Sequence, residues 1–140
     1  MAHVTFASVT EGQELPTFQR TTDFMHWNRY AAVNDEFVQL HMDDEAGKKV
    51  GQKGAFGMGN LQVAYLHNLL RQWVGDDCWI KKFRCELRGM NFKGDTLTAK
   101  GKVLKKYEQG GERLVDLELW TENQTGQKLC PGSATVVLFQ

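Results

Sequence analysis

The chain has 140 residues, 41% of them hydrophobic, and its 17 Lys and Arg side chains balance its 17 Asp and Glu side chains. This length predicts one domain, residues 1–140, around a single core, and zero net charge argues against a nucleic-acid partner. Three cysteines without a CxxC pair predict free thiols, and argue against a disulfide framework or a zinc site. With no signal-peptide pattern and no apolar run that could span a membrane, we expect a cytoplasmic protein.

The first part of the chain predicts short elements. Val4 to Pro16 is expected to be a lead-in strand and turn that ends at the proline. The segment Thr21-Thr22-Asp23 predicts a helix start with a threonine N-cap. A short amphipathic helix is expected from Asp23 to about Val33, and Glu36 to His41 is expected to be irregular or one helical turn. The helix is predicted from apolar side chains at helical spacing: Phe24, Trp27, Tyr30 and Ala31.

The segment from Asn34 to Asn60 contains the residues that could take part in catalysis. It contains an acid, Asp35, a histidine, His41, and a glycine-dense run from Gly51 to Gly59. Between them, residues 43–49 predict a second short helix, with acids at its start and lysines at its end. An acid, a base and a glycine turn before a helix are the groups needed for chemistry on a carbonyl compound.

The second half of the chain predicts one long helix and then a sheet. Apolar side chains recur at three- and four-residue spacing from Met58 to Val74, which indicates a mostly buried helix that ends at Gly75. After it the period changes to alternation, which predicts strands. Apolar positions of the four expected strands lie within 83–87, 97–103, 115–119 and 134–139.

Glycine-containing turns separate these four strands, at 93–95, 109–111 and 123–126. Consecutive strands joined by such turns predict an antiparallel meander. The sheet must bury its apolar face, and the helix from Met58 to Val74 is the only large partner. We therefore expect an α+β protein of the hotdog type, with an antiparallel sheet wrapped around one central helix.

These features resemble the MaoC-like dehydratases, the family that contains (R)-specific enoyl-CoA hydratases. The resemblance covers nearly the whole chain. Its clearest parts are Tyr30–Asp43, Phe56-Gly57-Met58, the strand connection at 92–97, and the terminal residues 132–136. The family pattern is Asp-x-Asn-Pro-x-His-x-Asp/Glu, followed downstream by a His-Gly-Met-like approach to the hotdog helix.

The resemblance implies a set of site residues. Asp35 matches the catalytic acid of the family and His41 its catalytic histidine. Gly57 matches the glycine whose backbone N–H stabilises an oxyanion, and Phe56 and Met58 are the expected walls of the substrate site. An acid of this kind works as a base near neutral pH only when burial raises its pKa, so the site should be apolar.

The sequence departs from the family pattern at two points. The family separates the acid and the histidine by five positions, whereas Asp35 and His41 lie six positions apart. Val38-Gln39 also replaces the Asn-Pro pair. Without the resemblance, Asp35 after a helix end is more often a turn or cap residue, and a lone histidine more often holds a loop in place.

The resemblance implies a hydratase or dehydratase that adds water to an enoyl thioester or removes it from a 3-hydroxyacyl thioester. It implies coenzyme A or acyl carrier protein as carrier, and a homodimer formed by sheet pairing. We expect neither a cofactor nor a metal, and no membrane partner. Two alternatives stay open: a non-catalytic hotdog subunit that completes a heteromeric hydratase, and a hotdog acyl-CoA thioesterase.

Overall fold

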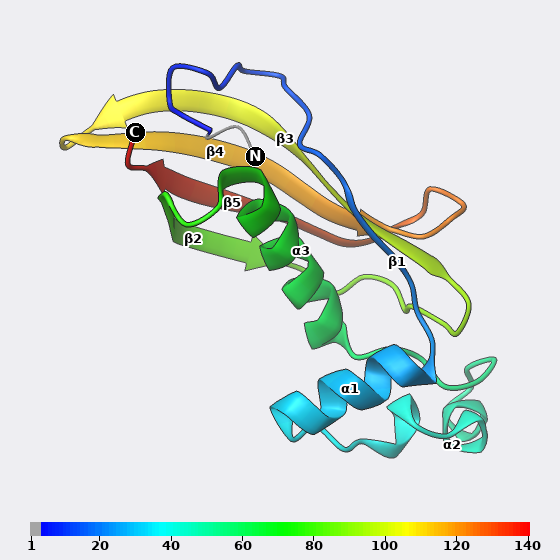
Figure 1. Cartoon of the computed structure of the whole chain (residues 1–140). Helices are drawn as coiled ribbons and strands as arrows, with labels where there is room; N and C mark the ends of the chain where they lie inside the picture. The colour runs from blue at the N-terminus through cyan, green and yellow to red at the C-terminus, as the bar shows by residue number, and fades with distance from the viewer. Residues whose placement is uncertain (1–3) are drawn as a thin grey trace.

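The structure is a computed structural model, and it describes residues 4–140. Five strands curl around one long helix, α3, and smaller helices extend beyond the beginning of that helix (Figure 1). Across these residues, no helix combines the length and apolar character needed to cross a membrane. The elements in chain order are β1 (Phe18–Thr21), α1 (Phe24–Asn34), the 3₁₀ turn η1 (Gln39–His41), α2 (Asp44–Lys49), α3 (Gly59–Val74), β2 (Cys78–Cys85), β3 (Thr96–Gln109), β4 (Glu112–Glu122) and β5 (Lys128–Leu138).

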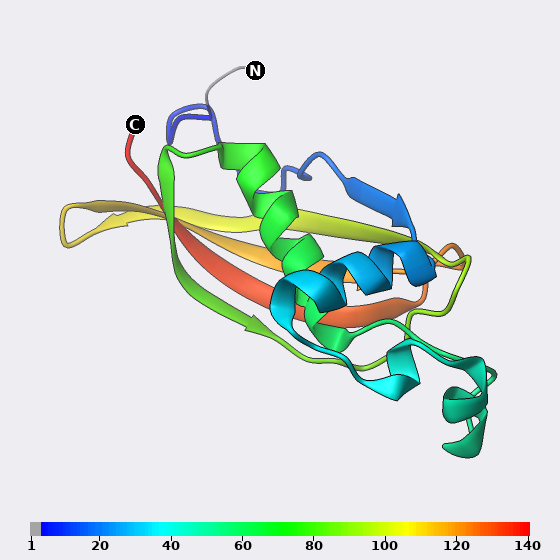
Figure 2. The ribbon, with the colours of Figure 1, turned by 60° about the horizontal axis from the view of Figure 1, so that its bottom comes forward.

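The central helix begins and ends where the sequence predicts. Met58 is its N-cap, and Gly75 ends it with a φ of 65°, a left-handed conformation that glycine adopts without strain. Its apolar face packs on the concave side of the sheet, where the core includes Leu66, Leu69 and Leu70 of α3, all fully buried. Figure 2 shows the helix lying across the sheet. The predicted α+β hotdog architecture is confirmed.

The strand order differs from the predicted meander. The sheet runs β1-β3-β4-β5-β2, with every neighbouring pair antiparallel, so β2 pairs with β5 and not with β3. The tight turns do join β3 to β4 and β4 to β5, as predicted. The connection from β2 to β3 is longer, residues 86–95, and such a connection does not force its two strands together. It passes the beginning of α3, and β2 remains at an edge of the sheet.

Two local predictions near the N-terminus are wrong. The first strand is β1, Phe18–Thr21, whereas the predicted lead-in region between 4 and 16 makes only an isolated bridge, Glu14 to Lys102. The N-cap of α1 is Asp23, not a threonine, because its carboxylate accepts hydrogen bonds from the N–H groups of residues 25 and 26. Thr22 is instead buried. A carboxylate in that place is also stabilised by the positive end of the helix dipole.

Candidate functional site

The segment from α1 to α3 builds the site beside the beginning of the central helix. α1 and α2 lie beyond that end of α3, outside the curl of the sheet (Figures 1 and 2). The turn η1 lies between the two helices and carries His41. The chain then returns through the glycine run, and residues 56–58 lead directly into α3.

Two hydrogen bonds hold the histidine against the residues that precede α3. The Phe56 N–H donates to the Leu40 carbonyl at 3.2 Å, and the imidazole Nδ1 of His41 lies 2.7 Å from the Phe56 carbonyl oxygen. A carbonyl can only accept, so Nδ1 must carry the hydrogen. In the neutral ring Nε2 is then left with a lone pair. His41 is therefore oriented as a hydrogen-bond acceptor and a base.

A pocket of about 240 Å³ places this histidine beside the start of α3. His41, Phe56 and Gly57 line it, together with Gly59 and Gln62 in the first turns of the helix. The connection after β2 also lines it, with residues 87–90. The structure thus brings three predicted site residues to one hollow, and Met58 is buried behind it at 1% exposure.

The beginning of α3 supplies hydrogen-bond donors to this pocket. The first N–H groups of any helix have no partner within the helix, and the N-cap residue Met58 offers no side-chain cap. The helix dipole makes the same end favourable to negative charge. Gly59 lines the pocket without a side chain of its own. The arrangement therefore suits an oxygen atom that gains negative charge.

The Gly57 N–H differs from the expectation. It donates to the Asn91 carbonyl at 2.6 Å, so it is not free to meet a substrate oxygen in this structure. Gly57 has a second, steric role: a Cβ placed there would lie 2.8 Å from Trp27 Nε1 and 3.0 Å from Asn91 Oδ1. These two residues are fully buried, and the Trp27 Nε1 and Asn91 Nδ2 atoms have no hydrogen-bond partner among residues 4–140. Glycine is needed here because the space behind it is filled.

The predicted acid, Asp35, lies outside the pocket. Asp35 caps the C-terminus of α1 in a left-handed conformation (φ 53°), its N–H donates to the Ala31 carbonyl, and its side chain is exposed. The next residue, Glu36, does not line the pocket either, but it is partly buried, and it is the acid that precedes His41 by five positions. Burial first, and then the nearby charge of Glu36, raise the pKa of the Tyr30 hydroxyl. The five-residue spacing was the signal in the sequence that pointed to Glu36.

The two aspartates after His41 hold α2 in place. Asp43 caps this helix by accepting from the Glu45 N–H at 2.9 Å. Asp44 accepts from the Ala55 N–H at 3.0 Å and pairs with Lys93 at 2.5 Å. The pairing with Lys93, together with the Ala55 hydrogen bond, lowers the pKa of Asp44. Asp43 and Asp44 therefore fix the glycine run from which Phe56 reaches the histidine.

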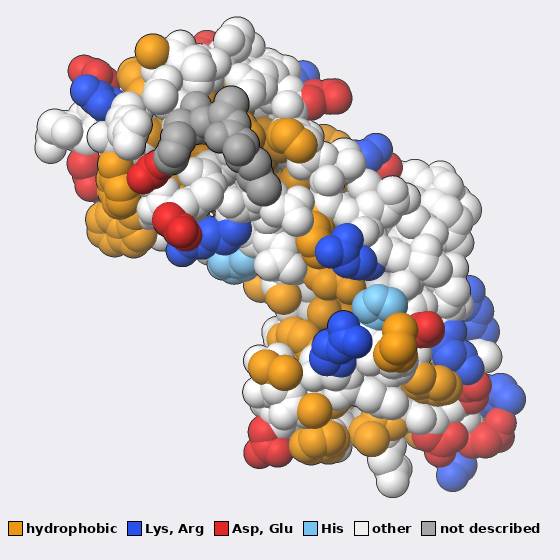
Figure 3. All heavy atoms as spheres, in the orientation of Figure 1, with side chains coloured by type: hydrophobic (Ala, Val, Ile, Leu, Met, Phe, Trp, Pro, Cys, Tyr) orange, Lys and Arg blue, Asp and Glu red, His pale blue; other side chains and the backbone are white. Residues whose placement is uncertain are grey.

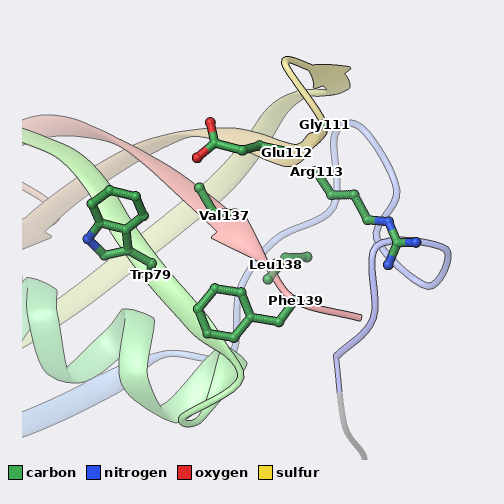
Figure 4. A pocket seen from close by; sticks show the side chains of 7 residues that line it. All are labelled: Trp79, Gly111, Glu112, Arg113, Val137, Leu138 and Phe139. Carbon is green, nitrogen blue, oxygen red and sulfur yellow. The ribbon is translucent and has the colours of Figure 1, made fainter.

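A second hollow lies at the edge of the sheet and contains none of the predicted site residues. It measures about 480 Å³ and is bordered by Trp79 of β2, Glu112 and Arg113 of β4, and the end of β5 (Figure 4). Trp79 and Phe139 border it with side chains that are 54% and 59% exposed. Within residues 4–140, no group of three or more His, Cys, Asp or Glu side chains could hold a metal ion.

Comparison with known proteins gives likenesses in structure only. No family model matches the sequence, and no curated protein matches it. R-hydratase PhaJ1 from Pseudomonas aeruginosa, in its unliganded form, matches with a TM-score of 0.87 at 18% identity, over 97% of this chain and 86% of that one. A MaoC-like dehydratase from Rhodospirillum rubrum matches with a TM-score of 0.82 at 19% identity, over 98% and 97% of the two chains.

A third likeness is to a chain of a two-component assembly. The ChsH1-ChsH2 complex from Mycobacterium tuberculosis matches with a TM-score of 0.81 at 19% identity, over 92% of this chain and 98% of that one. All three likenesses extend over nearly the whole chain. The chain therefore has the hotdog fold of these R-hydratases and MaoC-like dehydratases.

Proposed function

We propose that the protein is a hydratase or dehydratase that interconverts an enoyl thioester and a 3-hydroxyacyl thioester. The observation that carries this proposal is the orientation of His41, whose Nδ1 hydrogen is held by the Phe56 carbonyl in a pocket bounded by the start of α3. The free Nε2 can take a proton from water. The likeness of the fold to R-hydratases and MaoC-like dehydratases supports the same class of reaction.

The reaction needs a base and a hydrogen-bond donor that stabilises negative charge on the thioester oxygen. As water attacks the β-carbon, its proton passes to His41 Nε2 and later to the α-carbon, while negative charge builds on the thioester oxygen. The N–H groups in the first turn of α3, beginning with Gly59, would stabilise this charge in place of the occupied Gly57 N–H. Apolar walls from Phe56, Leu87 and Met90 would exclude bulk water from the reacting atoms.

We propose Glu36 as the acid that holds the attacking water together with His41, in place of the predicted Asp35. Glu36 is partly buried and has the five-residue spacing of the resembled family, whereas Asp35 is exposed at the end of α1. A partly buried carboxylate holds a water molecule in a defined place better than an exposed one does. Asp35 then acts as a helix cap.

Hydration of crotonyl-CoA, followed by the loss of enoyl thioester absorbance, tests the function and its residues. We expect His41→Ala and Glu36→Gln each to lower kcat on the order of 10²- to 10⁴-fold, as for loss of a general base. Asp35→Asn is the matched control, since it makes the same change from acid to amide one position away, and it should keep most of the activity.

Three other results would contradict parts of this proposal. Activity lost in Asp35→Asn and kept in Glu36→Gln would return the role of acid to Asp35. Release of free thiol without hydration would identify a thioesterase. Absence of both activities in the folded wild-type protein would favour a non-catalytic subunit, as in the alternative of a heteromeric hydratase.

We also propose that two copies pair through β2. Among residues 4–140 this strand pairs with β5 alone, so its other edge offers backbone groups to a second copy. At the opposite end of the sheet, residues 12–15 and β1 cover the corresponding edge of β3. Exposed Trp79 adds apolar surface at the open edge. A symmetric pair of β2 strands would satisfy both edges at once.

A further inference from the structure

Thr22 is a buried polar residue at the joint between β1 and α1, with no role in the chemistry proposed above. Its side chain is fully buried, and its hydroxyl donates to Asn91 Oδ1 at 2.7 Å. Asn91 lies in the connection between β2 and β3, directly after the residues 87–90 that line the site pocket. The contact therefore ties the wall of the pocket to a segment 69 positions away in the sequence.

The Asn91 carboxamide depends on this one hydroxyl. Its Nδ2 atom has no hydrogen-bond partner among residues 4–140, and within the same residues Oδ1 accepts from Thr22 alone. The side chain is only 1% exposed, and polar side chains are rarely buried without a hydrogen bond. Loss of the Thr22 hydroxyl would leave the carboxamide buried with no partner, which favours a shift of Asn91.

Asn91 in turn fixes the two residues that precede the N-cap of α3. Its backbone carbonyl accepts from the Gly57 N–H at 2.6 Å, and its Oδ1 lies 3.0 Å from the place that a Gly57 Cβ would occupy. The neighbouring residues, Phe56 and Phe92, form an antiparallel bridge. These four residues therefore pair as one short ladder, and a shift of Asn91 moves the ladder.

The ladder carries the carbonyl that orients the proposed base. His41 Nδ1 donates to the Phe56 carbonyl at 2.7 Å, and this contact keeps the hydrogen on Nδ1 and the lone pair on Nε2. A carbonyl displaced from that place no longer fixes the tautomer of the ring. A ring with its hydrogen on Nε2 cannot take a proton from water at that atom.

We propose that Thr22 and Asn91 are positioning residues for His41, an inference that rests on the proposed hydratase function. The Thr22 hydroxyl fixes Asn91, and Asn91 fixes the ladder. The Phe56 carbonyl in the ladder then selects the tautomer in which His41 is a base. Neither Thr22 nor Asn91 lines the pocket. Their effect should therefore appear in kcat and in the tautomer of the ring, with little change in KM.

The test compares kcat for the hydration of crotonyl-CoA in Thr22→Val and in Thr22→Ser. Valine has the shape of threonine without its hydroxyl, whereas serine keeps the hydroxyl. We expect Thr22→Val to lower kcat on the order of 10- to 100-fold, as when a reacting group is displaced by about 1 Å, and Thr22→Ser to restore most of it. Thr21→Val is the matched control, because the Thr21 hydroxyl one position earlier contacts Thr96 at an exposed pair of strand residues. It should keep the wild-type kcat.

Nitrogen NMR spectra of the imidazole give a second readout, which a purely structural role of Thr22 would not change. They distinguish a ring hydrogen on Nδ1 from one on Nε2. The neutral His41 ring should carry it on Nδ1 in the wild type, Thr22→Ser and Thr21→Val, and partly on Nε2 in Thr22→Val. If Thr22→Val fails to fold, Asn91→Ala repeats both measurements, since the Thr22 hydroxyl then still has the Asp95 carbonyl at 3.5 Å as an acceptor.

The outcomes separate the positioning role from the hydratase function. A folded Thr22→Val protein with the wild-type kcat, or with a lower kcat and an unchanged His41 spectrum, would overturn the positioning role and leave the function standing. A changed KM with an unchanged kcat would overturn it as well. If the wild type does not hydrate crotonyl-CoA, the proposed function is overturned and the His41 spectra alone decide the positioning role. A change in Thr22→Val that Thr22→Ser reverses then supports it, and equal spectra overturn it.

Discussion

At the scale of single residues, the site depends on groups whose partners lie far away in sequence. The His41 ring is oriented by the carbonyl of Phe56, and the Gly57 N–H is occupied by the carbonyl of Asn91. Neither contact follows from residue type or local spacing. The resemblance identified the histidine and the glycine, but only the structure shows which of their polar atoms remain available to a substrate.

Gly57 gives a prediction at this scale. Gly57→Ala should lower the free energy of unfolding by roughly 1–3 kcal/mol, because the added methyl group meets the buried Trp27 and Asn91 side chains. Chemical denaturation checks this result. The control is Ala46→Gly, which removes a methyl group from α2 in the same segment of the chain. Its expected cost is only about 0.5–1 kcal/mol. A Gly57→Ala protein as stable as the wild type would contradict the packing described here.

At the scale of elements, the glycine run and α2 act as a support for the residue that orients the histidine. Asp44 connects them through Ala55 and Lys93, and Ala55 directly precedes Phe56. The acids at the start of α2 and the lysines at its end were readable from the sequence, because they complement the helix dipole. The connection from Asp44 to Lys93 was not readable, because it joins residues 49 positions apart.

The Asp44 contacts give a pH prediction. Its pKa is lowered from the ordinary value of 3.8, chiefly by Lys93, so the unfolded chain binds the proton more tightly than the folded one. The stabilisation is therefore fully present above pH 3.8 and is lost as the pH falls through the lower, folded-state pKa. Hydrogen exchange should show α2 and the Ala55 amide losing protection in that acidic range. Asp44→Asn should lose this dependence, and an identical acid profile in Asp44→Asn and wild type would contradict the prediction.

At the scale of the whole molecule, the two edges of the sheet differ: one is formed by the short strand β1 and the other by the longer strand β2. Residues 12–15 and β1 pair with β3, whereas within residues 4–140 β2 is bonded on one side, to β5. Hydrophobic side chains, drawn in orange in Figure 3, are also visible around the smaller helices beyond α3. In this part of the chain Met25, Val33 and Phe37 are well exposed. Exposed apolar surface of this kind is common where another chain binds.

The open edge gives a prediction about assembly. Trp79→Asp should convert a dimer to a monomer, because it places a charge beside the β2 edge where the second copy is proposed to pair. Light scattering after size-exclusion chromatography checks the mass. Leu104→Asp is the matched control. Leu104 has the same exposure of 54%, but it lies on β3, which β4 and β5 separate from β2. A wild-type monomer, or a dimer that persists in Trp79→Asp, would contradict pairing at this edge.

The sequence by itself determined the elements that depend on local periodicity and caps. Helical spacing predicted a helix from Met58 to Val74 that ends at Gly75, and α3 spans Gly59–Val74. Glycine turns placed β3, β4 and β5 in order. The tertiary structure alone decided that β2 pairs with β5, that Asp35 is a cap outside the pocket, and that the Gly57 N–H is occupied by the Asn91 carbonyl. The reason is physical. Periodicity reports which face of an element is apolar, whereas strand pairing and the partners of a polar group depend on chain segments that meet only after folding.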